Sequence, residues 1–521
     1  MKKMKNQYTG KALRYGALAL SAALAWQVMS PSMTHFIGAM AEEDSRLSKI
    51  YGILSDNVGD PETAQDYYEM ANISIGKGEY ETALQQLETA RRLLMTVETA
   101  ETGEQTEVGG ENAAEQPELR DAATLSDDER TLLADICLKT ASVYILTDKL
   151  DEAQTALDET LEFNPDTVQA LILRAQLNIE QQDYAEAIVD MQKYLELNPT
   201  DVSNRQTLAQ LLENMSDYEG ARAQYETLYE QVPDDESFNL NALRCMFLCG
   251  RYEEAIAGFD AYKLKVAETG DLFGGVADFL RAACLMQMGD YAAAAEGFEM
   301  AIDAGYEKSY CLEQITLCSF ENGEYEKVLS AGNEMFGLEN AIVSAPELVY
   351  QRMGISAMRL GDYESALASM DKAAEYDPAL EGNDYYRGVC LLSLQRPSEA
   401  VEAFTASIEQ NYLPQFCYYN RGVCYVDLLE YDKAIDDMAM TLESGDDADL
   451  IAAAKDILWQ FAEYFDQLSA AEAAEETGAG AAATANATSD NDITLNVNVN
   501  VNGTAEEITE DTEVPEETEA E

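Results

Sequence analysis

The chain has 521 residues, and its 33 Lys and Arg against 98 Asp and Glu give a formal net charge of −65. This length exceeds what one compact core accommodates, so several domains or a repeat array are expected. The charge argues against nucleic acid and anionic membrane surfaces as partners, because binding to phosphates requires basic side chains. The single histidine, His35, lies near the N-terminus, so Ser-His-Asp, Cys-His and histidine-containing zinc sites are excluded from the rest of the chain.

Residues 1–41 have the pattern of a signal peptide. Five basic residues precede an apolar run at 15–29, and "AMA" at 39–41 stands directly before acidic residues. This order is typical of a secretory signal, here cleaved after Ala41. The alternative is an uncleaved membrane tether through residues 15–29, although that run is shorter than the ~20 residues of a typical spanning helix. Either way the body should be extracytoplasmic, secreted or associated with the cell envelope.

A short pattern recurs between residues 64 and 446: Gly or Asp, then Tyr, then Ala three residues after the Tyr. We call the residue at the Tyr place the marker. The ten markers are Tyr80, Leu150, Tyr184, Tyr218, Tyr252, Tyr291, Tyr325, Tyr363, Pro397 and Tyr431. From Leu150 onward they are 34 residues apart, except for two steps of 39 and 38. An amphipathic helix on each side of the marker, with Pro fifteen residues after four markers, predicts helix-turn-helix units.

This period and pattern resemble the tetratricopeptide repeat, or TPR. The resemblance implies an all-α fold, a right-handed superhelical solenoid of TPR-like repeats. Residues 64–97 would form the first repeat, 129–446 nine further repeats, and 448–468 a capping helix, with a short N-terminal segment at 42–63. Neighbouring units must stack, because no unit can bury its apolar face alone.

Two acidic stretches interrupt or end the array. Residues 98–128 contain almost no large apolar side chains, and residues 470–521 are rich in Ala, Glu, Thr and Asn. Such compositions cannot bury enough apolar surface to fold. We therefore expect a disordered acidic loop at 98–128 and a disordered acidic tail at 470–521.

The stretch "RGVC" occurs twice, ending at Cys390 and at Cys424. Both cysteines stand seven residues before a marker, as do Cys245, Cys284 and Cys318, where most other repeats have apolar residues. We interpret them as buried, unpaired small hydrophobes. A metal site lacks clustered ligands. Disulfides must account for an odd total of nine and one thiol per helix, yet exported proteins usually oxidise their thiols.

Arginine occurs ten residues before the marker as Arg174, Arg387 and Arg421, and Asp190 and Asp437 stand six residues after their markers. The two helices of a unit run antiparallel, so these two positions should lie close together. The sequence predicts the ion pairs Arg174–Asp190 and Arg421–Asp437. Arg387 faces an alanine in its own unit and must find another partner.

In TPR-like arrays the first helices line a concave face, at positions fifteen, twelve, eight and five before the marker. In the later repeats these positions hold Phe279, Tyr310, Phe320, Tyr385, Phe416 and Tyr419; in the earlier ones they hold Gln169, Gln176, Gln206 and Gln210. Exposed aromatic side chains are typical binding anchors, so we hypothesise that the six aromatic residues contact a partner. The alternative is that they pack against neighbouring units.

The sequence contains no P-loop, dinucleotide fingerprint or EF-hand loop, so we predict no catalytic, cofactor or metal site and no enzymatic activity. The expected function is an exported scaffold that binds a protein or peptide, with the acidic rim favouring basic flanks. The alternative is a structural or self-assembling envelope protein anchored by an uncleaved N-terminal helix.

Overall fold

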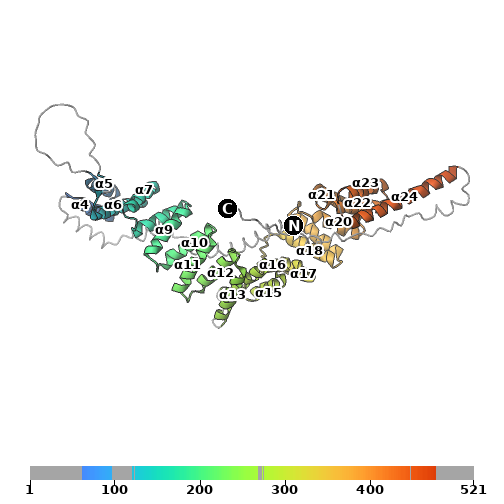
Figure 1. Cartoon of the computed structure of the whole chain (residues 1–521), viewed down its shortest axis with the longest axis horizontal. Coiled ribbons are helices and arrows are strands. Elements are labelled where there is room, and N and C mark those ends of the chain that lie inside the picture. The colour runs from blue at the N-terminus through green and yellow to red at the C-terminus, as the bar shows by residue number, and fades with distance from the viewer. Residues whose placement is uncertain are drawn as a thin grey trace, which may run out of the picture. The chain divides into compact units, whose positions relative to one another are not determined.

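The computed structural model describes residues 61–96, 120–121, 124–267, 273, 275–445 and 447–476. The expected signal or anchor at 1–41, nearly all of the segment at 42–63 and the end of the expected tail lie outside these residues. The described part contains 21 α-helices, α4 to α24 (Figure 1). It divides into two compact units, with the boundary between Gly258 and Phe259 inside α13.

The N-terminal unit begins with four consecutive helix pairs. Its helices are α4 (Ala64–Gly76), α5 (Tyr80–Met95), α6 (Asp127–Leu146), α7 (Leu150–Phe163), α8 (Val168–Glu180), α9 (Tyr184–Leu197), α10 (Val202–Asn214), α11 (Tyr218–Gln231), α12 (Glu236–Leu248) and the start of α13 (Tyr252–Val266). We call the first helix of each pair the A helix and the second the B helix.

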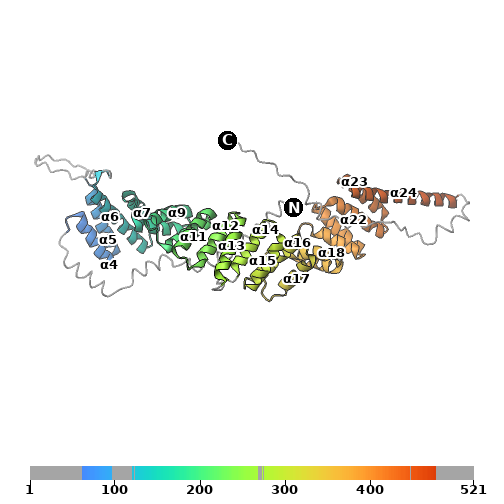
Figure 2. The same cartoon turned by 60° about the horizontal axis from the view of Figure 1, so that its bottom comes forward.

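The C-terminal unit continues the same pattern and ends in a long single helix. Its helices after α13 are α14 (Val276–Gln287), α15 (Tyr291–Asp303), α16 (Lys308–Glu321), α17 (Tyr325–Phe336), α18 (Pro346–Arg359), α19 (Tyr363–Tyr376), α20 (Asn383–Ser393), α21 (Pro397–Glu409), α22 (Pro414–Asp427), α23 (Tyr431–Glu443) and α24 (Ala448–Glu476). Figure 2 shows the A and B helices of a pair lying side by side, for example α4 with α5 and α22 with α23. The expected all-α solenoid of helix-turn-helix repeats is confirmed.

Every B helix begins at a marker residue, because the turn before it has one fixed geometry. The residue two before the marker has a positive φ in all ten repeats, and it is glycine in five of them. The N–H of the next residue then donates to a carbonyl five residues earlier, as Glu79 N does to Ser74 O at 2.9 Å. This is the helix-ending bond of a Schellman motif, which glycine accommodates without steric cost.

The interior of each helix pair consists of small and large side chains at fixed distances from the marker. All nine alanines that stand three residues after a marker, from Ala83 to Ala434, are fully buried. The large side chains seven residues after the marker, such as Phe298, Phe404 and Met438, are fully buried as well. The glycine of "RGVC" permits this packing: a Cβ at Gly388 would lie 2.6 Å from the Phe404 ring.

The expected disordered loop at 98–128 is wrong at its C-terminal end. Helix α6 begins at Asp127, and Ser126 and Glu129 form a capping box at its start. Arg120 forms an ion pair with Glu129 at 2.7 Å, and Leu125 is buried. The Ser-x-x-Glu spacing at 126–129 was the available sequence signal, because each side chain satisfies the other residue's backbone N–H.

The capping helix is longer than expected, and the expected tail is wrong at its start, because α24 continues through residue 476. Leu450, Ile457 and Phe461 on its inner face are buried in the core shared with α23. Trp459 points away from that core and is 70% exposed. Ala-rich and Glu-rich sequence extends a helix readily once packing has nucleated it.

Candidate functional site

Three of the six aromatic residues expected to line a binding groove are core residues instead. Phe279, Tyr385 and Tyr419 are 3%, 1% and 2% exposed. The Tyr385 ring lies against Phe404 and Tyr412, with centroids 6.2 and 6.1 Å away. The prediction that these three side chains line an exposed groove is therefore wrong.

The physical reason is that a side chain twelve residues before the marker points into the interior of its own unit. Phe279 repeats the arrangement of Tyr385: its ring contacts Phe298 at 5.2 Å and stacks on Tyr306 at 4.4 Å. In both repeats the partners stand seven and fifteen residues after the marker, on the B helix and in the loop beyond it. The side chain at this position thus packs against the B helix of its own unit and against the loop that follows this helix.

The other three residues, Tyr310, Phe320 and Phe416, are half-buried on the A helices α16 and α22. Met358 on α18 is also half-buried, and α16 contacts α18 directly. These side chains leave part of their apolar surface accessible on the A helices. In the N-terminal unit the position of Tyr310 and Phe416 is polar, as at the exposed Gln169, whereas the position of Phe320 holds apolar residues such as Ile179 and Phe247. Gln176, Gln206 and Gln210, at the other two expected groove positions, are half-buried.

Both predicted ion pairs are confirmed, and both are bidentate. Arg174 Nε and Nη2 donate to the Asp190 carboxylate at 2.8 and 2.7 Å, and Arg421 donates to Asp437 at 2.8 Å through both nitrogens. The hydrogen bonds that Arg174 donates to Asp190 are the largest cause of the raised pKa of Arg174. Arg387 pairs instead with Asp371 at 2.9 Å and Asp384 at 3.2 Å.

The sequence interpretation missed that these arginines also reach the preceding repeat. Their partners there stand eight residues after the previous marker: Asp158 for Arg174, Asp371 for Arg387, and the hydroxyl of Thr405 for Arg421. Arg281 occupies the same position and pairs with Asp260 at 2.7 Å. An A helix lies between two successive B helices, so the arginine ten before the marker spans both. We call this position the linking position.

Two surface cavities lie beside linking positions. The larger has a volume of about 340 Å³ and lies between α5 and α7, with Cys137, Thr140 and Tyr144 of α6 as its floor. The smaller has a volume of about 190 Å³ and is lined by Arg387, Asp371 and Ala403. Each cavity therefore lies between two successive B helices of its own unit.

Profiles of one family match this chain: the tetratricopeptide repeat, at residues 139–202, 178–237 and 352–414. The chain is a tetratricopeptide repeat protein. The TPR matches fall on helix pairs of both units, including α8 with α9 and α18 with α19.

Several solved structures are similar to this chain at low sequence identity. A tetratricopeptide repeat protein from Parabacteroides merdae is 16% identical over 56% of this chain and 98% of its own, with a TM-score of 0.26. The P58(IPK) TPR domain is 14% identical over 75% of this chain and 96% of its own, with a TM-score of 0.25. A structure of Naa15/Naa10 bound to HypK-THB is 13% identical over 76% of this chain and 71% of its own, with a TM-score of 0.28. No curated protein sequence matches the chain.

The thiols of this TPR protein are structural. All nine cysteines are unpaired, and eight of them, including Cys390 and Cys424, are buried, which confirms the sequence interpretation. Burial raises the pKa of both the Cys390 and the Cys424 thiol to about 12. Protonated, buried thiols are poor nucleophiles and poor metal ligands. Among the residues that the structure describes, no His, Cys, Asp and Glu cluster could hold a metal ion.

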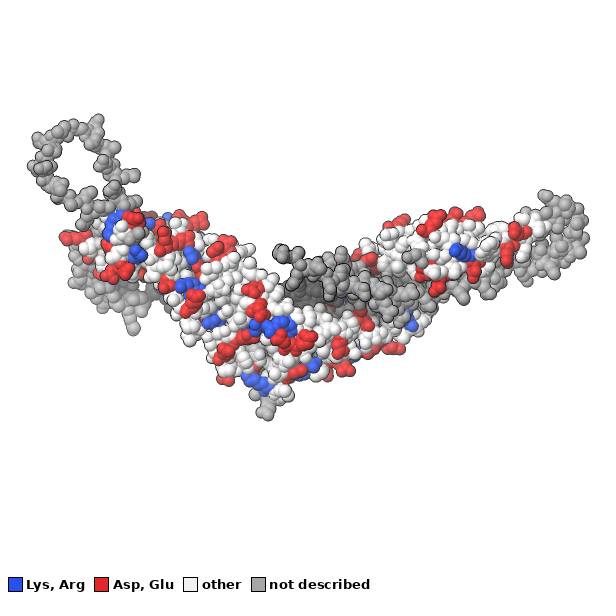
Figure 3. Space-filling model, in the orientation of Figure 1, with Lys and Arg blue, Asp and Glu red and all other residues white. Residues whose placement is uncertain are grey.

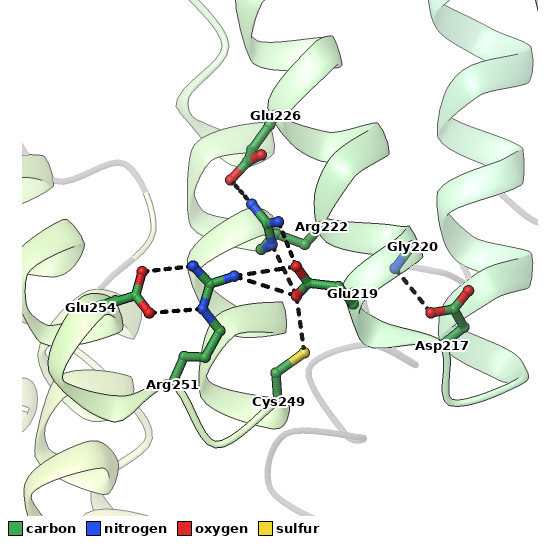
Figure 4. A network of polar contacts seen from close by, with 8 residues as sticks. All are labelled: Asp217, Glu219, Gly220, Arg222, Glu226, Cys249, Arg251 and Glu254. Atoms are coloured by element: carbon green, nitrogen blue, oxygen red, sulfur yellow. Dashed lines mark hydrogen bonds and ion pairs between the residues drawn. The ribbon is translucent and has the colours of Figure 1, made fainter.

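The one exposed cysteine, Cys249, belongs to a surface network between α11 and the α12–α13 turn (Figure 4). Its thiol contacts Glu219 at 3.7 Å, and Glu219 also accepts from Arg222 at 2.6 Å and Arg251 at 3.2 Å. The hydrogen bond from Arg222 is the main reason that the pKa of Glu219 falls to about 2. The pKa of Cys249 is raised by partial burial and by the Glu219 charge, so this thiol is not activated either.

The distribution of charged side chains over the surface is relevant to the kind of ligand that the protein can bind. On the face shown in Figure 3, Asp and Glu are scattered over the helices rather than gathered on one of them. Many of the basic side chains lie in ion pairs, such as Lys193 with Asp166 and Lys327 with Glu299. No helix in the described ranges is long and apolar enough to cross a membrane.

Proposed function

We propose that this protein is an exported scaffold that binds a segment of another protein along the A helices of its C-terminal unit. Tetratricopeptide repeats support a protein–protein interaction scaffold as the general class. The observation that carries the finer proposal is the set of half-buried apolar side chains on α16, α18 and α22: Tyr310, Phe320, Met358 and Phe416. We call this set the A-helix patch.

The A-helix patch differs from the core aromatic residues in accessibility. Tyr385 and Tyr419 already have all of their surface covered by the array, so they gain nothing from a partner. The side chains of the patch keep exposed apolar surface, and covering it would contribute roughly 25 cal/mol per Å². Aromatic residues in such positions are the usual anchors of a protein interface.

The chemistry of the partner follows from the charge of the chain. With 98 acidic against 33 basic residues, an apolar segment flanked by Lys or Arg would be attracted and an acidic one repelled. The signal pattern at 1–41 supports export, so the partner would lie outside the cytoplasm.

The test compares partner capture by the full chain and by two variants. Phe320→Asp with Phe416→Asp should abolish capture of a partner that the unaltered protein retains from an envelope extract. The control is Tyr376→Asp, on the B helix α19, where the ring is 56% exposed. Equal loss in both variants, or no loss in the first, would remove the A-helix patch from the proposal; circular dichroism checks that both variants fold.

The alternative, a self-assembling envelope protein, has its own supporting observation. Trp459 and Leu468 on α24 are 70% and 41% exposed, and apolar surface on a terminal helix can pack against another copy. Light scattering over a range of concentrations distinguishes the two functions. A mass that rises with concentration, and returns to the monomer value in Trp459→Lys, supports assembly over binding.

A further inference from the structure

The cavity between α5 and α7 owes its existence to one small residue. Thr140 stands ten residues before the marker Leu150, at the linking position. The same position holds Arg174, Arg281, Arg387 and Arg421 in four other repeats and the buried apolar residues Leu208, Ile315 and Met353 in three more. Of the two remaining repeats, the first has Met70 there, and the other has Ala242, where the side chain of the neighbouring Leu243 reaches the Gly258 position instead. Thr140 has no such substitute, and a cavity of about 340 Å³ opens above it.

The walls of the cavity keep the acceptors that an arginine uses elsewhere. Glu88 stands eight residues after the marker Tyr80, the place from which Asp158, Asp260 and Asp371 accept from their arginines. Glu152 and Glu159 of α7 line the opposite wall. Glu159 is already bonded to Arg91 at 2.8 Å, whereas Glu88 and Glu152 form no ion pair with any residue that the structure describes. Three carboxylates against one guanidinium leave the cavity with an excess of negative charge.

The floor of the cavity contributes an aromatic ring and further polar atoms to its lining. Tyr144 lies on α6 one turn beyond Thr140 and lines the same cavity, and the Lys149 ammonium lies over its ring, 5.9 Å from the centroid. The Thr140 hydroxyl donates to the Ile136 carbonyl at 2.9 Å, which leaves its oxygen lone pairs as acceptors. Burial raises the pKa of the Cys137 thiol to about 12; Arg91 opposes this shift, and Glu159 and Glu88 add to it.

From these observations we infer that the cavity between α5 and α7 binds an arginine side chain of a partner protein. The guanidinium occupies the linking position that Thr140 leaves open, with Glu88 as its principal acceptor and Glu152 on the other wall. The precedent is within the chain: Arg281 pairs with Asp260 of the preceding B helix at 2.7 Å, although the place six after its own marker holds Gly297. Arginine fits better than lysine, because a planar fork can reach both walls at once.

This site lies in the N-terminal unit and does not depend on the A-helix patch. A partner that presents an apolar segment with basic flanks could use either surface, and each can fail without the other. The ligand class is an exposed arginine in a flexible segment, since the cavity is open at the surface and accommodates one side chain rather than a folded domain.

The experiment measures binding of two pentapeptides to the full chain. They are Gly-Gly-Arg-Gly-Gly and its citrulline counterpart, each with a neutral dye and blocked ends, followed by fluorescence anisotropy at low salt. Citrulline has the shape of arginine without the charge, so we expect the arginine peptide to bind about tenfold more tightly. Equal affinity for both peptides would overturn the inference.

Three variants locate the binding. Glu88→Gln with Glu152→Gln should reduce the affinity for the arginine peptide to that for the citrulline peptide. Asp183→Asn with Glu186→Gln changes the net charge equally on exposed positions of the same unit and should leave binding unchanged. Thr140→Arg should fill the cavity, pair with Glu88 and abolish binding.

The outcomes separate a site from general attraction to an acidic protein. Equal losses in the two double variants would show attraction without a site and would overturn the inference. Unchanged binding in folded Thr140→Arg would do the same. If Thr140→Arg does not fold, the comparison of the two double variants still decides the question.

Discussion

The repeats α20–α21 and α22–α23 begin with nearly the same residues, "YYRGVC" at 385–390 and "YNRGVC" at 419–424, yet their arginines are held differently. Arg421 is bidentate to Asp437 of its own B helix. Arg387 faces Ala403 there and pairs with Asp371 of the preceding repeat and with Asp384. The nearly identical local sequence therefore fixes where the guanidinium lies. Residues sixteen positions away on either side, together with Asp384 in the case of Arg387, decide what neutralises it.

The difference also has a spatial consequence. Where Asp437 is present, its carboxylate fills the space next to the arginine. Where Ala403 replaces it, a cavity of about 190 Å³ remains beside Arg387. The residue at the linking position and its partners thus determine how strongly neighbouring repeats are held together. They also determine whether a cavity remains between the two B helices.

The largest expected loss of stability comes from substituting the buried tyrosine that the two repeats share. Tyr385 and Tyr419 occupy the same position and are both buried, so Tyr385→Ala and Tyr419→Ala should each reduce the free energy of unfolding by about 3–5 kcal/mol. Urea unfolding followed by circular dichroism measures this. Losses below about 1 kcal/mol, as surface substitutions give, would mean that these rings are not core residues after all.

The next effect should separate the two repeats. Asp437→Ala leaves the Arg421 guanidinium without its bidentate partner in a largely buried setting and should cost about 3 kcal/mol. Asp371→Ala removes a half-exposed partner of Arg387 and should cost at most about 1 kcal/mol. The same unfolding measurement compares them, and equal costs would contradict the distinction between the two arginines.

A smaller effect is expected at the turns before the B helices. Leu429 has a φ of 61° two residues before its marker, where Gly361 stands in the repeat α18–α19. Leu429→Gly should stabilise the protein by about 1 kcal/mol, because a left-handed conformation strains a residue with a Cβ. The control is Leu428→Gly, one residue earlier in a right-handed conformation, which should destabilise it.

A further variant gives the repeat α20–α21 the carboxylate that Asp437 supplies in the repeat α22–α23. Ala403→Asp places a carboxylate beside Arg387 in the existing cavity and should stabilise the protein by up to about 1 kcal/mol. Hydrogen exchange of the α20 and α21 amides detects such a local gain. Faster exchange in the variant would show that the cavity does not accept the carboxylate in the geometry of Asp437.

No difference at all is expected for the shared cysteines. Cys390 and Cys424 are both buried, so a maleimide at neutral pH should leave both unlabelled in the native protein while it modifies the exposed Cys249. Mass spectrometry of native and denatured samples gives the result. Rapid native labelling of either buried thiol would contradict its place in the core.

Sequence reasoning located the repeats closely because their signals are local. The markers predicted where B helices begin, and the structure begins each B helix at a marker. The pairs Arg174–Asp190 and Arg421–Asp437 were predictable for the same reason: sixteen residues across one antiparallel turn bring two positions together in every repeat. For the candidate site the sequence was less reliable, since Phe279, Tyr385 and Tyr419 proved to be buried, while Tyr310, Phe320 and Phe416 keep accessible surface.

By itself, then, the sequence determined the period, the turn geometry, the alanine and large apolar interior and the contacts within each unit, because a short antiparallel hairpin leaves little freedom. Tertiary structure alone decided how an A helix lies between two B helices, and hence that Arg174 also reaches Asp158. It also decided that the position of Tyr385 faces Phe404 and Tyr412, and that Thr140 leaves a cavity lined by Glu88. The contact between Arg174 and Asp158 and the cavity at Thr140 depend on the rotation between successive units, which is set by the packing of many side chains together and by no local pattern.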